Sequence, residues 1–459
     1  MLKSLKFLIW TYLVLLIFEG AVRKWIFPGA ADLILIVRDP VVILIYVLAV
    51  LARVFPVNGW IIALAVLTAA SVAASFIAGQ TNLEVMIYGL RINYLHVPLI
   101  WVMGAALDRR DVERYGSFLL VMAIPMALIM IEQFRSPMNA PINRGVGGTE
   151  IGQIFGANGK IRPPGLFSFI TGPQLFLPLT AAFFFHQAGV HRKLPWFLLI
   201  GAGIAVAVSL PVSISRTAMI ATGLVAATFA FTLLFAARRG GAIVRTGIIG
   251  AILIVGLSSL PIFQESREVF LSRWQTAAIS SDGDAVQNIS DRVFGGFFTP
   301  FAVAERARPF GMGIGVGSNV GAKLLAGKMG FLLAEDEWSK IFLELGPVLG
   351  GAFLLFRIVL TAWLGSVALL ALLRRREGLP LLIFSAAGVA VFQYQWAPPT
   401  ILGFAVFGGG MVLAALNSPP VEPIVPEADN HHPEPVLLPP PVPPANAHRP
   451  PVLAKVPAS

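Results

Sequence analysis

Two short segments of the sequence carry side chains that could bind or activate a negatively charged substrate. In SLPVSISRTAMIATG, Arg216 directly precedes an apolar run. A guanidinium presents several donors in a fixed geometry that suits a diphosphate or a carboxylate. If the run crosses a membrane, Arg216 lies at the membrane surface, where it could hold the head group of a lipid-linked pyrophosphate. The alternative is an arginine that reaches the phosphates of the surrounding lipid.

The second segment places three consecutive carboxylates, Glu335, Asp336 and Glu337, before the apolar sequence WSKIFLELGPVLGG. Carboxylates at the beginning of a helix are stabilised by its dipole and often act only as caps. A carboxylate beside the membrane surface could also act as a general base on a sugar hydroxyl. The residues alone leave both roles open.

Membrane-spanning helices must position these side chains. The 459 residues are 56% hydrophobic and 13% charged, with a mean hydropathy of +0.79, whereas soluble domains are roughly one quarter charged. A helix needs about 20 apolar residues to cross the hydrocarbon core, and twelve segments qualify or nearly do. We therefore predict one all-α polytopic membrane domain at residues 1–417. The predicted spans are 5–19, 33–55, 59–78, 84–107, 113–133, 165–187, 195–213, 217–236, 243–262, 345–372, 379–395 and 398–416.

Lysine and arginine in the short loops predict the orientation, because cytoplasmic loops are enriched in both. With the N-terminus inside, the short outer loops hold only Arg23, Lys24 and Arg216. Both termini are then cytoplasmic, and residues 134–164 and a large loop at 263–344, between the ninth and tenth spans, lie outside. The net charge of +10 mainly reflects topology and does not indicate nucleic acid. The basic residues of the inner side are Lys3, Lys6, Arg53, Arg109, Arg110, Arg114, Arg192, Lys193, Arg238, Arg239, Arg374, Arg375 and Arg376.

The predicted outer loops narrow the chemistry further. The chain has no cysteine, which excludes disulfides, thiolate metal sites and cysteine nucleophiles. No histidine lies in an outer loop, so a carboxylate is the natural candidate base.

Arg292 opens the apolar stretch DRVFGGFF, which should lie against the membrane surface. The segment GMGIGVG at 311–317 lacks the Gly-Lys-Ser/Thr of a phosphate loop, and we interpret it as a tight turn whose backbone approaches a ligand or another helix.

Four polar residues fall inside predicted spans: Arg38, Asp39, Arg91 and His96. Such groups are costly in lipid and must face the interior of the bundle, water or one another. We expect them to pair with each other or to line a substrate cavity, and a proton relay is the alternative.

The C-terminal residues 418–459 contain 14 of the 34 prolines. A stretch of this composition cannot form helices or bury a core. We predict a disordered cytoplasmic tail, which could bind a partner that the sequence does not name.

Taken in order, several segments resemble the O-antigen ligase and O-antigen polymerase family of bacterial polysaccharide enzymes. They are RPPGLFSFITGPQLFLPL at 162–179, SISRTAMIATGLV at 213–225, DRVFGGF and RPFGMGIGVGSN in the long loop, and EDEWSKIFLELGPVLGG at 335–351. The N-terminal EGAVRKWIFP and VRDPVVILIY resemble a subgroup of the polymerases. The resemblance covers nearly everything before the proline-rich tail.

This resemblance implies a fold similar to the glycosyltransferase-C superfamily and a metal-independent transfer of glycan from undecaprenyl pyrophosphate. The family's two pyrophosphate-binding arginines fall on Arg216 and Arg292. Ligases usually carry a His-Asn pair eleven residues before the glycine that ends a short outer helix. Here that glycine is Gly346, and Glu335 and Asp336 occupy the pair, a departure that favours a polymerase over a strict ligase.

The expected function is polymerisation of undecaprenyl-pyrophosphate-linked repeat units at the outer face of the bacterial inner membrane, with inversion. Glu335, Arg216 and Arg292 are the expected catalytic residues, and no metal or cofactor is expected. The expected partners are the lipid-linked donor, a glycan or lipid A-core acceptor, membrane lipid and chain-length or export proteins. Alternatives are a ligase, a flippase for lipid-linked sugars or an assembly protein. The further substrate-binding candidates are Arg162, Asp336, Glu337 and Arg91.

Overall fold

The computed structural model describes residues 1–149, 153, 155–156, 159–189, 193–235, 261–279, 296–328 and 330–417. These residues belong to one compact unit that extends from Met1 to Pro419. The predicted proline-rich tail at 418–459 lies outside the described residues, as do Arg292 and all but the end of the predicted ninth span at 243–262.

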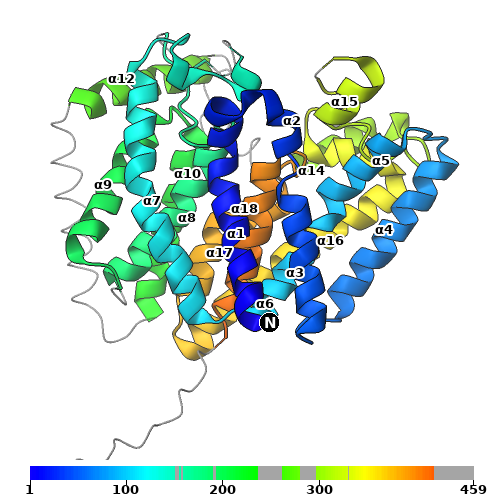
Figure 1. Ribbon diagram of the computed structural model, residues 1–459, viewed down its shortest axis with the longest axis horizontal. Coiled ribbons are helices and arrows are strands. Elements are labelled where there is room, and N and C mark those ends of the chain that lie inside the picture. Colours follow the sequence, from blue (N-terminus) through cyan, green and yellow to red (C-terminus); the bar gives the residue numbers. More distant parts are fainter. Residues whose placement is uncertain are drawn as a thin grey trace, which may run out of the picture. The chain divides into compact units, whose positions relative to one another are not determined.

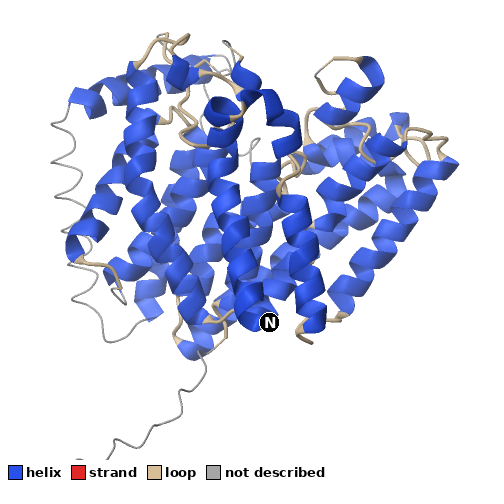
Figure 2. Ribbon diagram, in the orientation of Figure 1, coloured by secondary structure: helices blue, strands red, loops and turns tan. Residues whose placement is uncertain are grey.

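The described residues are helical, and their only β pairing is an isolated bridge between Phe155 and Ile161 (Figure 2). The elements are labelled in Figure 1. They are α1 (Leu2–Ala21), η1 (Val22–Ile26), η2 (Pro28–Ala30), α2 (Ala31–Ile34), α3 (Arg38–Leu51), α4 (Gly59–Ile77), α5 (Leu83–Leu90), η3 (Arg91–Leu95), α6 (Leu99–Ala106), α7 (Arg109–Arg135), η4 (Pro141–Asn143), η5 (Val146–Gly148), α8 (Thr171–Gly189), α9 (Trp196–Val212), α10 (Arg216–Phe235), α12 (Pro261–Ile279), α14 (Gly296–Val303), η7 (Ala304–Arg306), α15 (Asn319–Ala326), α16 (Glu337–Arg375), α17 (Leu379–Phe392) and α18 (Pro399–Ala414).

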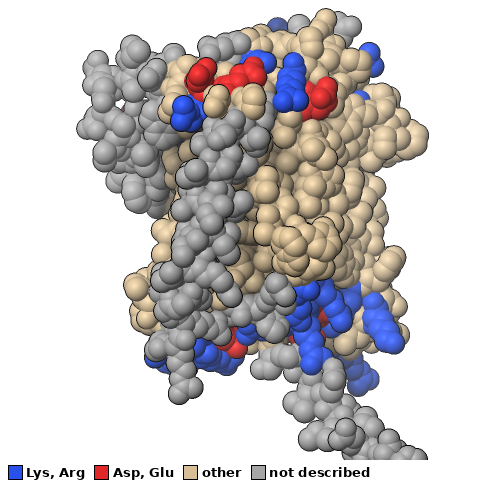
Figure 3. All heavy atoms as spheres, turned by 90° about the vertical axis from the view of Figure 1, so that its left-hand side faces the viewer, with Lys and Arg blue, Asp and Glu red and all other residues tan. Residues whose placement is uncertain are grey.

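Among the described residues, seven helical segments are long and apolar enough to cross a membrane, and α9, α17 and α18 are shorter apolar helices. The seven are Leu2–Ile26, Pro28–Leu51, Gly59–Ile77, Leu83–Ala106, Arg109–Arg135, Arg216–Phe235 and Glu337–Arg375. On the face shown in Figure 3, the charged side chains lie towards the two ends, with an uncharged surface between them. The prediction of an all-helical fold is confirmed for the described residues, and these helices indicate a polytopic membrane protein.

The predicted sixth span, 165–187, corresponds to α8, which begins later, at Thr171, and is not among the seven. This helix carries polar residues such as Gln174, Thr180 and His186, but most of its side chains are buried and none is exposed. It packs against α7, α9, α10, α17 and α18. Protein neighbours therefore surround α8 and accommodate the polar groups that lower its hydropathy.

Close packing around α18 forms the centre of the unit. Nearly every residue of this helix is buried, as expected for a helix that is apolar on all sides. A Cβ at Gly408 would lie 2.3 Å from Cβ of Ala387 on α17, and one at Gly410 would lie 2.7 Å from the sulfur of Met103 on α6. Small residues thus let α18 approach both neighbours, a common device between membrane helices.

Basic side chains join several helix termini at one end of the unit, which we call the basic end (lower part of Figure 1). Lys6 of α1 pairs with Asp111 of α7, and Arg109 of α7 pairs with Glu377, just beyond α16, at 3.1 Å. Further contacts there are Lys193 Nζ with Glu113 at 3.0 Å, Arg375 Nη1 with the Leu416 carbonyl at 3.2 Å and Arg376 Nη1 with the Phe235 carbonyl at 2.6 Å. The starts of α1 and α7 and the ends of α10, α16 and α18 therefore meet, and many of the predicted inner basic residues lie together.

At the opposite end, α16 is interrupted where the sequence predicts the end of a short helix. Gly346 has φ +82° and ψ 170°, and Pro347 follows it. The carbonyls of Leu343 and Glu344, which the break frees, accept hydrogen bonds from the backbone N–H groups of Met312 and Gly313, both at 3.0 Å. The loop that contains GMGIGVG therefore caps the short helix formed by residues 337–345.

Replacing Gly346 by alanine should lower the thermal stability of the purified protein. A side chain is strained at this positive φ, and its Cβ would lie 2.3 Å from the Pro309 carbonyl oxygen. We expect a loss of about 2 kcal/mol or more, measured as a fall in Tm in detergent. Gly351→Ala in the same helix is the control, because a Cβ there has no neighbour within 4 Å. Equal Tm values for the two variants would contradict this interpretation of the break.

Candidate functional site

A cleft of about 430 Å³, which we call the polar cleft, lies at the end of the unit opposite the basic end. Its lining includes Thr171 at the start of α8, Thr217 in the first turn of α10 and Asp336 immediately before α16. Three helix N-termini therefore converge on the cleft, and their dipoles favour an anionic ligand there. The remaining lining residues are Gln174, Glu337, Trp338, Gln393, Tyr394, Gln395 and Ile401.

The turn before α10 fixes Arg216 as the first residue of that helix. Ile214 adopts φ +48° with its side chain fully buried, a strained conformation for a β-branched residue. The Ser215 hydroxyl accepts hydrogen bonds from the Ala218 backbone N–H at 3.3 Å and from Nε2 of Gln174 at 3.0 Å. Ser215 therefore caps α10 and joins it to α8, so the half-buried Arg216 begins its helix directly beside Thr217 of the cleft.

The three consecutive carboxylates have different environments. Asp336 caps α16, because its Oδ1 accepts from the Ser339 backbone N–H at 2.8 Å and from the Thr299 hydroxyl at 2.9 Å. Asp336 therefore takes the cap role, one of the two roles that the sequence left open for this cluster. Glu335 is exposed, and its backbone carbonyl accepts a hydrogen bond from Nε2 of Gln395, a residue of the cleft lining.

Glu337 is buried and forms part of the wall of the cleft. One carboxylate oxygen accepts from Arg357 Nη1 at 3.1 Å and from the Trp396 backbone N–H at 3.2 Å, and the other lies 2.5 Å from Lys340 Nζ. Arg357 also donates to the Tyr394 carbonyl at 2.8 Å and lies over the Trp396 ring. This carboxylate stabilises two buried cations and the connection between α17 and α18, a structural role that is distinct from catalysis at the surface.

Sequence reasoning missed Arg357, although an arginine in the middle of an apolar run was a usable signal. Its side chain is completely buried. Removing one partner of a buried ion pair leaves an uncompensated charge, so Arg357 and Glu337 hold the cleft wall as a unit.

Tyr394 also lines the cleft. A phenol hydroxyl is protonated at neutral pH and can donate a hydrogen bond to an anion.

The polar residues predicted inside spans do pair with one another. The Tyr12 hydroxyl lies 3.1 Å from His96 Nδ1, and His96 Nε2 lies 3.0 Å from Asp39 Oδ1. Asp39 also pairs with Arg91, whose Nη2 donates to the Leu35 carbonyl at 2.8 Å. Arg91 is therefore part of a buried network and is not among the lining residues of the polar cleft.

The network continues through α1, whose charged residues were harder to recognise as buried from the sequence. Glu19 accepts from Arg38 Nε at 3.0 Å and pairs with Arg23 Nη1 at 3.3 Å. Arg38 also donates to the Tyr12 hydroxyl at 3.4 Å. Glu19 and Arg23 lie near the end of an apolar helix, so their partners on other helices were not evident from spacing.

The glycine-rich segment at 311–317 packs against helices, one of the two alternatives that its composition left open. Its Ile314 backbone N–H donates to the Ser75 hydroxyl at 3.0 Å, and the Ile314 carbonyl accepts from Gln80 Nε2 at 2.9 Å. A Cβ at Gly315 would lie 2.3 Å from the Val85 carbonyl oxygen. The glycines therefore permit close contact of the loop with α4 and α5.

Of the predicted site residues, only Asp336 and Glu337 line the polar cleft, whereas Arg216 and Glu335 are chain neighbours of the lining residues Thr217 and Asp336. Arg162 is half-buried, and its buried Nε has no hydrogen-bond partner among the described residues. Arg292 lies outside the described residues. Within the described part of the chain, no group of three or more His, Asp or Glu side chains is placed to hold a metal ion.

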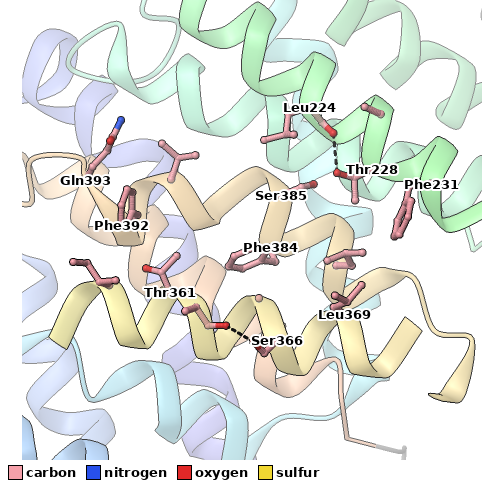
Figure 4. Close-up of a pocket in the computed structure, with 16 residues that line it drawn as sticks. Leu224, Thr228, Phe231, Thr361, Ser366, Leu369, Phe384, Ser385, Phe392 and Gln393 are labelled. Carbon is pink, nitrogen blue, oxygen red and sulfur yellow. Dashed lines mark hydrogen bonds between the residues drawn. The ribbon is translucent and has the colours of Figure 1, made fainter. Parts of the chain in front are cut away.

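An apolar groove of about 950 Å³ runs between α10, α16 and α17 (Figure 4). Its hydroxyl groups are satisfied within their own helices: Thr228 donates to Leu224, Ser366 to Ala362, Thr361 to Arg357 and Ser385 to Leu382. The groove therefore presents a lining with little unmet hydrogen-bonding capacity. Gln393 lines both this groove and the polar cleft, so the two cavities are adjacent.

No protein-family model, curated protein or solved structure matches this chain.

Proposed function

We propose that this protein is a membrane glycosyltransferase that polymerises oligosaccharide repeat units carried on a polyprenyl pyrophosphate. The observation that carries the proposal is the continuity at Gln393 between the polar cleft and the apolar groove. A lipid-linked donor needs a polar site for its pyrophosphate and sugars beside an apolar surface for its hydrocarbon chain. The converging helix N-termini support an anionic head group in the cleft.

The proposed topology has twelve crossings, with the polar cleft at the outer membrane face and both termini in the cytoplasm. The contacts that gather basic residues at the opposite end support this orientation, because cytoplasmic ends are enriched in lysine and arginine. The resemblance to the O-antigen polymerase family and to the glycosyltransferase-C fold belongs to the same proposal.

In the proposed reaction, an acceptor sugar hydroxyl attacks the anomeric carbon of the donor. The bond from that carbon to the pyrophosphate oxygen breaks, the hydroxyl proton passes to the Glu335 carboxylate, and polyprenyl pyrophosphate leaves. Attack opposite the leaving group inverts the anomeric centre. Negative charge grows on the pyrophosphate as the bond breaks, so Arg216 stabilises the transition state more than the ground state. Arg292 has the same role in the proposal, on the basis of the sequence alone.

The decisive experiment supplies purified protein with a lipid-linked repeat unit and no other acceptor. Polymerisation should give a ladder of lipid-linked products that differ by one repeat unit. A reaction that begins only when lipid A-core is added would identify a ligase. Movement of the intact lipid-linked sugar across vesicles without any new glycosidic bond would overturn the proposal in favour of a flippase.

Filling the apolar groove should impair this reaction while leaving the fold intact. Ala362 is exposed on α16 and lines the groove, so Ala362→Trp places an indole where the polyprenyl chain would lie. We expect KM for the lipid-linked donor to rise about tenfold or more, consistent with the displacement of a few apolar groups. Ala230→Trp, at an exposed position of α10 that is not among the groove residues, is the matched control. The same KM in both variants would exclude the groove as the lipid site.

A further inference from the structure

A second cavity, of about 440 Å³, lies beside the polar cleft, and we call it the basic cavity. Its lining includes three cationic side chains, Arg23, Lys323 and Lys340, and one carboxylate, Asp32. A volume of this size is typical of cavities that bind small molecules or one or two sugar units. Positive charge therefore predominates on its wall.

Two of these cations are buried and share their carboxylate partners with other cations. Arg23 is 8% exposed and Lys340 is 3% exposed. The partner of Arg23, Glu19, also binds Arg38, and the partner of Lys340, Glu337, also binds Arg357. Buried charges are costly unless they are paired, so this sharing leaves positive charge that an anionic ligand can neutralise.

The ion pairs that extend from Arg23 and Lys340 show which of the two has fewer carboxylates around it. Lys340 flanks Gly317 together with a second carboxylate, Glu344. In the network that contains Arg23, three arginines, Arg23, Arg38 and Arg91, share two carboxylates, Glu19 and Asp39. Of these arginines only Arg23 lines the cavity, together with Asp32.

Lys323 and Asp32 form the outer part of the wall. Their side chains are 53% and 85% exposed and form an ion pair at 3.0 Å. The cavity also includes Ser318 and Asn319, at the start of α15. The positive end of that helix dipole adds a further contribution that favours an anion.

The basic cavity and the polar cleft have a common wall. Gln395 lines both cavities, and the Glu337–Lys340 ion pair has its carboxylate in the polar cleft and its ammonium in the basic cavity. Two ligands in these cavities would therefore lie on either side of one layer of side chains. Substrates that react must touch, so this adjacency suits an acceptor that is anchored in the basic cavity by one sugar while a neighbouring sugar extends past Gln395 to a donor in the polar cleft.

We propose that the basic cavity binds the acceptor glycan through an anionic substituent, a carboxylate or a phosphate carried by one of its sugars. This inference rests on the proposed function, since it assigns the donor to the polar cleft and the groove. It makes the protein selective for acidic repeat units. Arg23 and Lys323 contact the anionic group, while Asp32 opposes it.

The test measures binding and turnover with soluble acceptor oligosaccharides. Calorimetry should detect binding of a uronate-bearing or a phosphate-bearing oligosaccharide and not of the uronate methyl ester. The oligosaccharide that binds, the uronate-bearing or the phosphate-bearing one, identifies the anionic substituent.

Lys323→Gln should raise the acceptor Kd and KM about tenfold, because a hydrogen bond to a charged group is lost, with kcat unchanged. Lys328→Gln is the matched control, since this exposed lysine is not among the cavity residues.

Asp32→Asn separates ligand binding from a merely structural ion pair. If the Asp32–Lys323 pair only supported the fold, both variants would impair the protein. Under the proposal they act in opposite directions, and Asp32→Asn lowers the Kd for the acidic oligosaccharide. Equal binding of the acid and its ester, or effects of the same sign in both variants, would overturn the inference. Binding of the acid without any product ladder would instead overturn the proposed function and leave the anion site standing.

Discussion

Arg216→Ala should lower kcat for polymerisation by about 10²- to 10³-fold, the usual loss when one donor to a developing negative charge is removed. Arg216 begins α10 beside Thr217, at a cleft where three helix N-termini converge. Its guanidinium and the helix dipole would act on the same pyrophosphate. The measurement is initial product formation from a lipid-linked repeat unit, with each variant first matched to wild type in Tm.

Two further variants define what Arg216 contributes. Arg216→Lys keeps the charge but loses the planar set of donors, so it should recover only part of the rate. Arg135→Ala removes an exposed arginine at the last residue of α7 and should leave kcat unchanged. A wild-type kcat in Arg216→Ala would remove this residue from the catalytic site.

Glu335→Gln should reduce kcat by about 10²- to 10⁴-fold, the range that general base catalysis contributes. Of the three consecutive carboxylates, Glu335 is the exposed one, whereas Asp336 caps α16 and Glu337 pairs with Arg357 and Lys340. The amide keeps the shape of the side chain and cannot accept the proton. The expected signature is a loss of kcat with little change in Tm or in donor KM.

The neighbouring carboxylates provide internal comparisons. Asp336→Asn should change both kcat and Tm little, because Asp336 acts as a helix cap and an asparagine oxygen can still cap the helix. Glu84→Gln, at an exposed site in the first turn of α5, is the control for a general effect of charge. Retained activity in Glu335→Gln would assign the proton acceptor to another group or to the substrate itself.

The sequence predicted those features that depend on local pattern. The all-helical fold follows from apolar runs of nearly membrane-spanning length, whereas the end of a short helix at Gly346 was expected only from the family resemblance. The cost of isolated charges in lipid predicted that Arg38, Asp39, Arg91 and His96 pair or line a cavity, and the structure shows that Arg91 pairs with Asp39. For the fold and for the buried charges, a physical penalty leaves few alternatives.

Features that depend on distant contacts could not be predicted in the same way. Glu337 was expected to bind substrate because of its position in the sequence. Arg357 lies twenty residues later in α16, and only the fold shows that it pairs with the Glu337 carboxylate. The polar cleft combines residues of α8, α10, α16 and the α17–α18 connection. The groove depends on which faces of α10, α16 and α17 the other described residues leave open, and hydropathy does not determine this.

The position of the apolar groove changes how substrate supply should be described. Because its lining continues into the polar cleft through Gln393, a polyprenyl chain can follow it without leaving a hydrocarbon environment, and the spent carrier can depart by the same route. Under the proposed function, the protein then encounters its lipid-linked donor by lateral diffusion within the bilayer. The relevant concentration is the mole fraction of donor among the lipids, so diluting the vesicles at constant lipid composition should leave the turnover rate per protein unaltered.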